Sequence, residues 1–466
     1  MKKTTCKAVI FLLTIIFQIL PGFAKSDGSI TPEMIKKYER QLDLKGTDKA
    51  LMNAVTNTEM KQLTLNREIY NNHNDVFSFK IKTEGITDQK SSGRCWMFAG
   101  FNIMRPGVIK KYNLSSFEFS ETFLFFWDKL EKSNLFLEIM IDNAAKDLTD
   151  REMQKLFETP VADGGWWNYF VALIEKYGAV PKEVYPETVN SEKSAGFNYV
   201  INNLMRHDAI ELRRMVQKKN KKSAIKKRKE EMLADVFRLL VYHFGLPPQN
   251  FTWKYADKDN KVVEKEYTPK EFYEEVVGID LKEYVTIMDH AMHPYNTHYE
   301  INYCRNFVDM PNMDFINLDI AELKKLTLAT LLDSTPVWFA ADVGHYMEKE
   351  RGIMAVDLYD YQTLFQIDTR ISKKDRLLTR ASTPNHGMVF TGVDLKDGKP
   401  VKWLVENSWG SKIGNGGRWT MYDNWFDEYV FTIIIHKSRL SEDVLKLLKT
   451  KPSTLPPWDP MMTVLP

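Results

Sequence analysis

The sequence predicts an α+β fold in which helices dominate the earlier part of the chain and short strands the last part. Between about residues 190 and 333 the pattern is largely helical and highly charged, whereas β-like runs such as 387–394 and 401–410 dominate over 336–435. Helices and strands that are segregated in this way indicate α+β architecture rather than alternating β–α–β units. With 466 residues, 44% of them hydrophobic, the chain can fill one large core or two.

Three helices are predicted before residue 190 because apolar and aromatic residues recur there at helical spacing. They cover residues 95–104, 120–137 and 167–177. Pro106 should end the first helix, and Gly178, with Pro181 beyond it, should end the third. Earlier in the chain, alternating apolar and polar residues over 76–82 predict a half-buried strand, and 29–72 has the composition of a polar, partly helical lead-in.

The N-terminus has the pattern of a secretory signal peptide. Three lysines in the first seven residues precede an apolar run over 8–20, which is followed by Gly22 and Ala24. We therefore predict a signal peptide over 1–24, a mature chain that starts near Lys25, and a periplasmic or secreted location. The alternative is an uncleaved membrane anchor, but a helix of about 13 residues is too short for the ~30 Å of a bilayer core.

Charge gives no indication of a nucleic-acid or membrane partner. The 64 Lys and Arg residues nearly balance the 62 Asp and Glu residues, and the formal net charge is +2, so the field of the whole protein is weak. A basic stretch over 213–229 could bind a polyanion. It lacks an aromatic residue for stacking and is followed by Glu230 and Glu231, so we interpret it as a solvated helix face.

The three cysteines do not make a disulfide framework. Removal of the signal peptide would take away Cys6 and leave Cys95 and Cys304. In an exported protein, a retained and unpaired cysteine is either buried and inert or present for its chemistry. Cys304 has aromatic and apolar neighbours, which predicts a packing role, and we expect it to lie too far from Cys95 to pair with it.

Cys95 has the sequence position of a nucleophile. It follows a Gly-Arg turn and opens the predicted helix over 95–104, where the positive end of the helix dipole should favour the thiolate and lower the thiol pKa. The N–H of a residue in the first helical turn has no partner within the helix. Together with the side-chain amide of Gln89, six residues earlier, the N–H of Cys95 could form an oxyanion hole.

A reactive thiol also needs a base, and His386 is the candidate among the nine histidines. It stands at the start of a β-like run, where a strand could hold its ring. Asn407, 21 residues later, follows another such run, and its side-chain oxygen could accept from the ring N–H and fix the tautomer. Trp409 could shield this hydrogen bond from water and contribute to the substrate-binding cleft.

The order Gln, Cys, His, Asn, with six residues from Gln to Cys and a Cys-Trp pair that opens a helix, resembles the papain-like cysteine peptidases. The resemblance is closer to the bleomycin hydrolase or aminopeptidase C branch. The segments that carry it are 89-QKSSGRCW-96, 117-FEFSETFLFFWDKLEK-132, 163-DGGWWNYFVALIEKYGAVPKEVYP-186, 403-WLVENSWG-410 and 457-PWDPM-461. Their order and spacing cover nearly all of the chain after about residue 60. One departure is Gly387-Met388 after the histidine, where the family commonly has Ala-Met.

The resemblance implies a papain-like fold with a helical half, a β-barrel-like half and a large helical insertion. The implied segments are an N-terminal lead-in at 25–75, the helical half with the nucleophile at 76–190, the insertion at 191–335, the β half with the histidine and asparagine at 336–450, and a C-terminal arm at 451–466 that lies in the active-site cleft. The resemblance also implies a ring-shaped homohexamer with inward-facing sites.

For function, the resemblance implies an aminopeptidase that cleaves short peptides from the amino end. The implied catalytic residues are Cys95 as nucleophile, His386 as base, Asn407 as the orienting residue and Gln89 as the oxyanion donor. Gly164 and Gly165 match the part of the cleft wall that the substrate backbone approaches closely. The terminal carboxylate at Pro466 is expected to meet the ammonium group of the substrate.

Two other functions could use the same residues. A non-catalytic module on this fold could bind peptide or polyanion, and a Cys–His acyltransferase would pass the acyl group to an amine rather than to water. We favour hydrolysis because a non-catalytic module has no physical need for all four residues of the set. The reaction requires no cofactor.

No metal site is predicted. His290, His293 and His298 are close in sequence, but their spacing matches no zinc pattern, and Pro294 interrupts any single helical face. We interpret them as ordinary loop histidines.

Overall fold

The computed structural model describes residues 28–462 of the chain, and these residues form two compact units that meet between Leu63 and Thr64 in the sequence. The predicted signal peptide at 1–24 and the terminal Pro466 lie outside the described residues. Within 28–462, no helix combines the length and the apolar character needed to cross a membrane.

The first unit is helical where it is described. It contains α1 (Pro32–Glu39), α2 (Thr47–Asn57) and the start of α3 (Met60–Thr64). The Oγ1 of Thr31 accepts a hydrogen bond from the N–H of Met34 at 3.2 Å and so caps the start of α1. No residue of α1 or α2 is buried, so packing into a core contributes little to these two helices.

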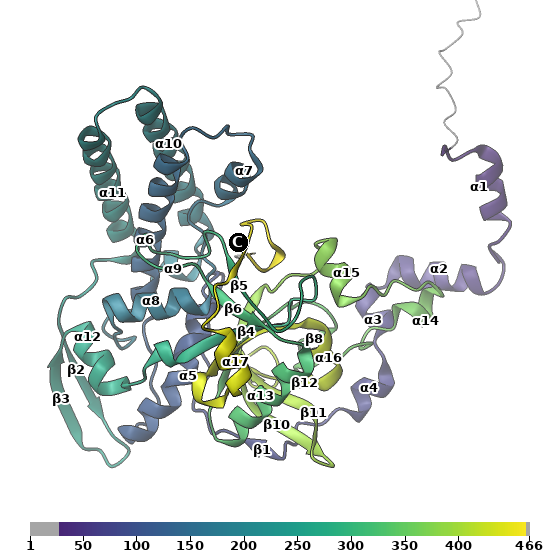
Figure 1. Ribbon diagram of the computed structural model, residues 1–466. Helices are drawn as coiled ribbons and strands as arrows, with labels where there is room; N and C mark the ends of the chain where they lie inside the picture. Colours follow the sequence, from purple (N-terminus) through teal and green to yellow (C-terminus); the bar gives the residue numbers. More distant parts are fainter. Residues whose placement is uncertain (1–27, 463–466) are drawn as a thin grey trace, which may run out of the picture. The chain divides into compact units, whose positions relative to one another are not determined.

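The second unit contains the longer helices. Its α-helices are α4 (Arg67–Asn72), α5 (Cys95–Lys111), α6 (Glu121–Asp142), α7 (Arg151–Glu158), α8 (Trp167–Tyr177), α9 (Val189–Glu192), α10 (Ala195–Gln217), α11 (Lys222–Phe244), α12 (Pro269–Phe272), α13 (Ile320–Leu332), α14 (Tyr361–Phe365), α15 (Lys373–Leu378), α16 (Asp423–Tyr429) and α17 (Glu442–Leu447). Helices α6, α10 and α11 run side by side (Figure 1).

Local signals set the ends of two predicted helices. The Oγ of Ser120 accepts from the N–H of Phe123 at 3.1 Å and caps the start of α6. Gly178 ends α8 with φ +74°, and a Cβ at this position would lie 2.2 Å from the carbonyl oxygen of Pro269. Glycine is therefore required here both by the backbone conformation and by the close approach.

Helix α5 continues beyond Pro106, where the sequence predicts its end. A proline within a helix removes one N–H donor and crowds the preceding turn, yet α5 runs to Lys111. Val108 and Ile109, beyond the proline, are buried in the core. The predicted end at Pro106 was wrong because burial of the last turn outweighs the local cost of the proline.

The main sheet has twelve strands. They are β1 (Phe79–Lys80), β4 (Tyr284–Met288), β5 (Thr297–Ile301), β6 (Asp314–Asn317), β7 (Val337–Ala341), β8 (Met347–Glu348), β9 (Ile353–Met354), β10 (His386–Lys396), β11 (Lys399–Glu406), β12 (Arg418–Tyr422), β13 (Val430–His436) and β14 (Ser453–Leu455). Neighbours follow the order β14–β5–β6–β4–β13–β7–β10–β11–β12–β9–β8, and β1 pairs with β10. The antiparallel register of β10 and β11 pairs Val389 with Glu406. His386, at the start of β10, therefore lies beside Asn407, directly after the end of β11.

The segment 191–335 is helical only in part, whereas the sequence predicts a helical insertion there. After α11 a hairpin follows, formed by β2 (Phe251–Ala256) and β3 (Val262–Tyr267). Strands β4, β5 and β6 of the same segment join the main sheet. They have only four or five residues each, so their alternation is too short to stand out from the helical pattern that precedes it.

The basic stretch 213–229 spans the end of α10 and the start of α11. Three of its cations have acidic partners: Arg228 Nε lies 2.7 Å from Glu211 Oε1, Lys226 Nζ lies 4.0 Å from Glu230 Oε1, and Lys229 pairs with Glu138. These ion pairs lower the positive charge that the stretch presents to solvent.

Three apolar clusters fill the described part of the second unit: a large one among the helices, a second against the sheet, and a small one around Ile353 and Leu358. In the sheet core, Phe339 of β7 and Phe390 of β10 stack with ring centroids 3.8 Å apart. The indole N–H of Trp338 on β7 donates to the carbonyl oxygen of Trp96 on α5 at 3.2 Å. This contact ties the start of α5, and with it Cys95, to the sheet.

A buried ion pair joins α5 to β11. Arg105 Nη2 lies 2.7 Å from Glu406 Oε1, and the two side chains are 2% and 1% exposed. Glu406→Gln would leave the Arg105 charge buried without a carboxylate, so we expect the free energy of unfolding to fall by about 3–5 kcal/mol. Urea denaturation followed by circular dichroism measures this change.

The matched control is Glu230→Gln on α11. The Glu230 side chain is 61% exposed and lies 4.0 Å from Lys226, so its replacement should change the free energy of unfolding by less than ~0.5 kcal/mol. Equal changes in the free energy of unfolding for the two substitutions would show that the buried ion pair stabilises the fold no more than the exposed one.

Candidate active site

Cys95 is the first residue of α5 and is 6% exposed. The residue before it, Arg94, is fully buried, and its Nη2 lies 3.0 Å from Glu187 Oε2. The N–H of Gly387 donates to the Sγ of Cys95 at 3.4 Å. The sulfur therefore lies at a helix N-terminus and against the start of β10.

His386 is buried at the start of β10. Its Nε2 lies 2.8 Å from the Oδ1 of Asn407. The indole of Trp409 packs against the imidazole with ring centroids 4.8 Å apart. Since Asn407 occupies Nε2, Nδ1 is the ring nitrogen that remains for the thiol.

The orientation of the Asn407 amide is set by the next residue. The N–H of Ser408 donates to Asn407 Oδ1 at 2.8 Å, so this atom is an acceptor and must be the oxygen. His386 therefore donates to the same oxygen through Nε2–H, and its Nδ1 carries the lone pair. An imidazole in this tautomer can accept a proton from a thiol.

Ser408 also holds Gln89. The Ser408 hydroxyl donates to Gln89 Oε1 at 2.7 Å, and Gln89 Nε2 donates to the carbonyl oxygen of Ser92 at 2.7 Å. The backbone N–H of Gln89 donates to the carbonyl oxygen of Ser408 at 2.8 Å. These bonds use one of the two amide hydrogens of Gln89 and leave the other for a ligand.

Cys95 and His386 line one small cavity of about 30 Å³, the room of about one water molecule. Its other lining residues are Trp96, Gly164, Gly165, Trp166, Trp338, Ala340, Pro384, Asn385 and Gly387. Gly165 permits close packing, because a Cβ at this position would lie 2.7 Å from the Trp96 ring. The predicted cleft-wall glycines thus lie beside the thiol and the imidazole.

Burial governs the protonation of the Cys95–His386 pair. It raises the pKa of the Cys95 thiol to about 11, although the N–H groups of Gly387, Trp96 and Cys95 act in the opposite direction. Burial also lowers the pKa of the His386 imidazole to about 4, against the hydrogen bond with Asn407. The pair therefore holds one proton between about pH 4 and about pH 11, on the sulfur or on Nδ1. The predicted lowering of the thiol pKa was wrong for the thiol by itself, because burial outweighs the helix N–H groups.

Two residues of the site were not predicted from the sequence. Ser408 follows Asn407 directly, but its hydroxyl reaches Gln89 only through the fold, from 319 positions away. Lys132, on α6, is buried and lies 2.6 Å from Asp128 Oδ2, and its Nζ donates to the carbonyl oxygen of Gly164 at 2.7 Å. A lysine in a helix that is rich in aromatic residues carries no local signal for this role in the cleft wall.

Cys304 has the packing position that the sequence predicts. It is completely buried, and the hydroxyl of Tyr169 donates to its Sγ at 3.7 Å. Both cysteines among the described residues are free thiols.

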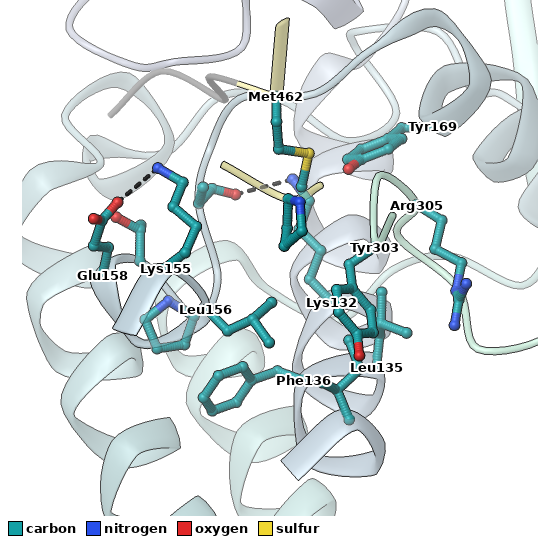
Figure 2. A pocket seen from close by; sticks show the side chains of 15 residues that line it. Lys132, Leu135, Phe136, Lys155, Leu156, Glu158, Tyr169, Tyr303, Arg305 and Met462 are labelled. Atoms are coloured by element: carbon teal, nitrogen blue, oxygen red, sulfur yellow. Dashed lines mark hydrogen bonds and ion pairs between the residues drawn. The ribbon is translucent and has the colours of Figure 1, made fainter. Parts of the chain in front are cut away.

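The C-terminal arm is described as far as Met462. Strand β14 pairs in parallel with β5, and the guanidinium of Arg151 lies 4.6 Å from the centre of the Trp458 ring. Arg380 donates to the carbonyl oxygen of Trp458. Pro457 and Met462 line a cavity of about 310 Å³ (Figure 2).

The sequence predicts that this arm lies in the active-site cleft. The cavity that Pro457 and Met462 line does not include Cys95 or His386. Lys132 links the arm cavity to the Cys95 cavity. It lines the arm cavity, and its Nζ donates to the carbonyl oxygen of Gly164, which lines the Cys95 cavity. The described part of the arm thus reaches the neighbouring cavity, and residues 463–466 lie outside the described part of the chain.

Comparison with known proteins identifies the family. The profile described as the Peptidase C1-like family matches residues 29–462. The chain belongs to this family. Among its relatives, Aminopeptidase C of Lactobacillus delbrueckii subsp. lactis is 42% identical over 392 residues, which are 83% of this chain and 87% of the relative. Aminopeptidase C of Lactobacillus helveticus is 40% identical over 438 residues, which are 93% of this chain and 98% of the relative.

Solved structures include a close match to this Peptidase C1-like chain. The crystal structure of PepW from Lactobacillus rhamnosis HN001 superposes with a TM-score of 0.92 at 38% identity and covers 94% of this chain and 100% of that one. The predicted α+β papain-like fold and the predicted aminopeptidase C relationship are therefore confirmed. The enzyme class, a papain-like cysteine-type aminopeptidase, is confirmed by the same matches.

Proposed function

We propose that this chain hydrolyses peptide bonds through Cys95, His386 and Asn407, and that it removes residues from the amino end of short peptides. The observation that carries the proposal is a hydrogen-bonded series from the imidazole through Asn407 and Ser408 to Gln89, beside a thiol at the start of a helix. This series orients the imidazole of His386 as the base and leaves one amide hydrogen of Gln89 free to bind an oxyanion. Acyl transfer from Cys95 requires both groups.

The proposed reaction begins when Nδ1 of His386 takes the thiol proton as the Cys95 sulfur attacks the scissile carbonyl carbon. The C–S bond forms, and the carbonyl electron pair moves to the oxygen. The N–H of Cys95 and the unused amide hydrogen of Gln89 donate to this oxyanion. The imidazolium then gives its proton to the leaving amine as the C–N bond breaks. Water, deprotonated by His386, releases the acyl group from the sulfur.

The neighbouring residues have supporting roles in this proposal. Asn407 keeps the imidazole in the tautomer that has its lone pair on Nδ1. Trp409, packed on the ring, limits the access of water to that hydrogen bond. The substrate backbone lies along Gly164 and Gly165, which line the same cavity as Cys95 and His386.

The preference for amino ends depends on the arm. Met462 lines the cavity next to the wall that contains Gly164, and four residues follow it in the sequence. A carboxylate at Pro466 that reaches the cleft would pair with the ammonium group of a free amino terminus and would not pair with an acetylated one. The name that the relatives carry, Aminopeptidase C, supports this direction of cleavage.

Alkylation of the thiols tests the assignment of nucleophile and base. We expect iodoacetamide to modify Cys95 at least roughly tenfold faster than Cys304, in parallel with the loss of activity. The rate should stay level from about pH 8 to about pH 5 and fall with a midpoint near pH 4, because protonation of His386, whose pKa burial lowers to about 4, removes the acceptor of the thiol proton. Peptide mass spectrometry after timed quenching measures both rates.

His386→Ala is the control for this experiment. Without the imidazole, the rate at Cys95 should follow the raised pKa of the thiol and climb steadily with pH. A midpoint near pH 6.5 in the wild type, or equal labelling of Cys95 and Cys304, would contradict the assignment.

We further propose that the chain is exported after cleavage near Lys25 and assembles as a homohexamer. The charged start and apolar run at the N-terminus support export, and the aminopeptidase C resemblance supports the hexamer. Native mass spectrometry of the exported protein should give six chains that each begin at or near Lys25. A single chain, or an intact Met1, would count against the corresponding part of the proposal.

A further inference from the structure

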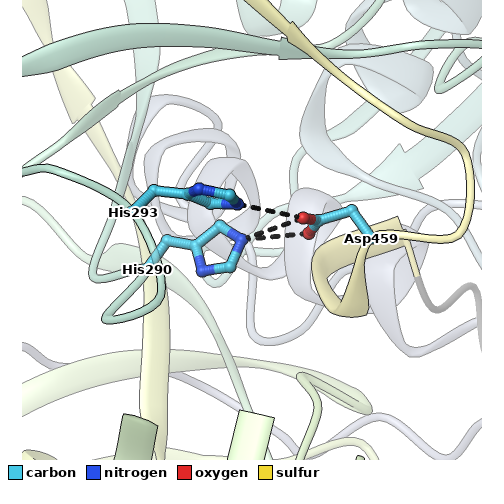
Figure 3. A group of neighbouring side chains, drawn as sticks. All are labelled: His290, His293 and Asp459. Carbon is cyan, nitrogen blue, oxygen red and sulfur yellow. Dashed lines mark hydrogen bonds and ion pairs between the residues drawn. The ribbon is translucent and has the colours of Figure 1, made fainter. Parts of the chain in front are cut away.

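Two histidines and an aspartate from distant parts of the chain converge outside the active site. His290 and His293 lie in the loop after β4, and Asp459 lies in the C-terminal arm. His290 Nε2 lies 3.0 and 3.2 Å from the two carboxylate oxygens of Asp459, and His293 Nε2 lies 3.4 Å from one of them (Figure 3). His298 takes no part, because its Nε2 lies 3.0 Å from Asp314.

The donor atoms of this group lie close enough together to share one small metal ion. Its three ligand atoms lie within 4.8 Å of one another. Ligands at the ~2.0–2.1 Å that Zn²⁺ prefers are ~3.3–3.4 Å apart in a tetrahedron, close to the nitrogen–oxygen distances found here. Two imidazole nitrogens and one carboxylate oxygen are also a donor set that Zn²⁺ accepts.

The group is open to solvent on one side. The side chains of His290 and Asp459 are 0% and 3% exposed, whereas that of His293 is 27% exposed. A fourth ligand can therefore reach the group from the side of His293. Sites with three protein ligands and one water molecule are common for Zn²⁺.

We propose that His290, His293 and Asp459 bind one Zn²⁺ ion per chain, with water as the fourth ligand. Because Asp459 belongs to the arm and the histidines follow strand β4, the ion would fasten the arm to the main sheet. In the absence of metal, the two Nε2–H groups donate to the carboxylate and hold the arm less firmly. None of the three residues lines the cavity of Cys95.

The surroundings of His290 limit the expected affinity for Zn²⁺. Binding of Zn²⁺ at Nε2 moves the ring proton of each neutral histidine to Nδ1. The Nδ1 of His290 is buried and has no hydrogen-bond partner among the described residues, so the outer contacts that would orient this ring are incomplete. We therefore expect micromolar rather than nanomolar binding.

Isothermal titration of Zn²⁺ into the full-length Cys95→Ala variant tests the proposal, because this background removes the catalytic thiol as a competing ligand. We expect one equivalent to bind, and the dissociation constant to rise at least about tenfold in His293→Ala and in Asp459→Asn. The matched control is His207→Ala, which removes an exposed histidine that pairs with Asp208 and should leave binding unchanged.

Titration with Co²⁺ gives a second readout. Four-coordinate Co²⁺, bound by two imidazole nitrogens, one carboxylate oxygen and water, should absorb strongly in the visible range. It should show no sulfur-to-metal charge-transfer band. Circular dichroism of His293→Ala, in which only a partly exposed side chain is changed, separates ligand loss from unfolding. Absence of binding at submillimolar Zn²⁺, binding unaffected by His293→Ala and Asp459→Asn, or equal weakening by His207→Ala would overturn the proposal.

Discussion

Replacement of Cys95 by alanine should lower kcat for peptide hydrolysis by roughly 10⁴- to 10⁶-fold, the loss found when a covalent nucleophile is removed from a catalytic set. Cys304, the other cysteine of the described residues, is buried outside the Cys95 cavity and its Sγ accepts a hydrogen bond from the Tyr169 hydroxyl, so it cannot take the place of the Cys95 sulfur. Wild type and variant are incubated with a peptide mixture under reducing conditions, and the products are followed by mass spectrometry. His386→Ala should cause a loss of similar size, because the two residues act as one unit.

Cys304→Ser provides the matched control, because it changes the other buried cysteine and keeps an acceptor for the Tyr169 hydroxyl. It should retain activity within about threefold if the fold is intact. If wild type and Cys95→Ala degrade the peptides equally slowly, the chain is a non-catalytic peptide-binding module. If the wild type consumes substrate only when an acceptor amine is added, the acyltransferase alternative gains support.

Deletion of 462–466 should abolish the preference for free amino ends. We expect the wild type to cleave free-amine peptides about 10- to 100-fold better than their N-acetylated forms, the difference that one charge-assisted hydrogen bond supplies. The truncated enzyme should lose this ratio and begin to cut at internal bonds, because the non-primed side of the cleft is then open. Liquid chromatography of paired acetylated and free peptides measures the ratio.

The labelling rate of Cys95 by iodoacetamide shows whether the truncated enzyme is intact, since no described residue of the arm lines the Cys95 cavity. That rate should stay within about twofold of the wild-type value. A preference that is absent in the wild type, or that survives the truncation, would show that the arm does not determine specificity.

Much of the site was predictable because its signals are local. The Gly-Arg turn before Cys95 places it at the start of a helix, and the β-like runs around His386 and Asn407 predict the strands β10 and β11, which the structure then pairs. Gly178 ends α8 for the same kind of reason, a backbone conformation that favours glycine. Local signals failed at Pro106, where burial of the following turn decides the outcome.

By itself, the sequence determined the family, the α+β class and the candidates Cys95, His386, Asn407 and Gln89, since helix starts, strand periodicity and motif order can be read from neighbouring residues. Only the tertiary structure decided the directions of the pKa shifts, because burial depends on everything that packs around a group. It also brought Ser408 to Gln89 across 319 positions, and Asp459 to His290 across 169. Contacts of this kind form between segments that carry no common local pattern, so they exist only once the sheet and the arm have assembled.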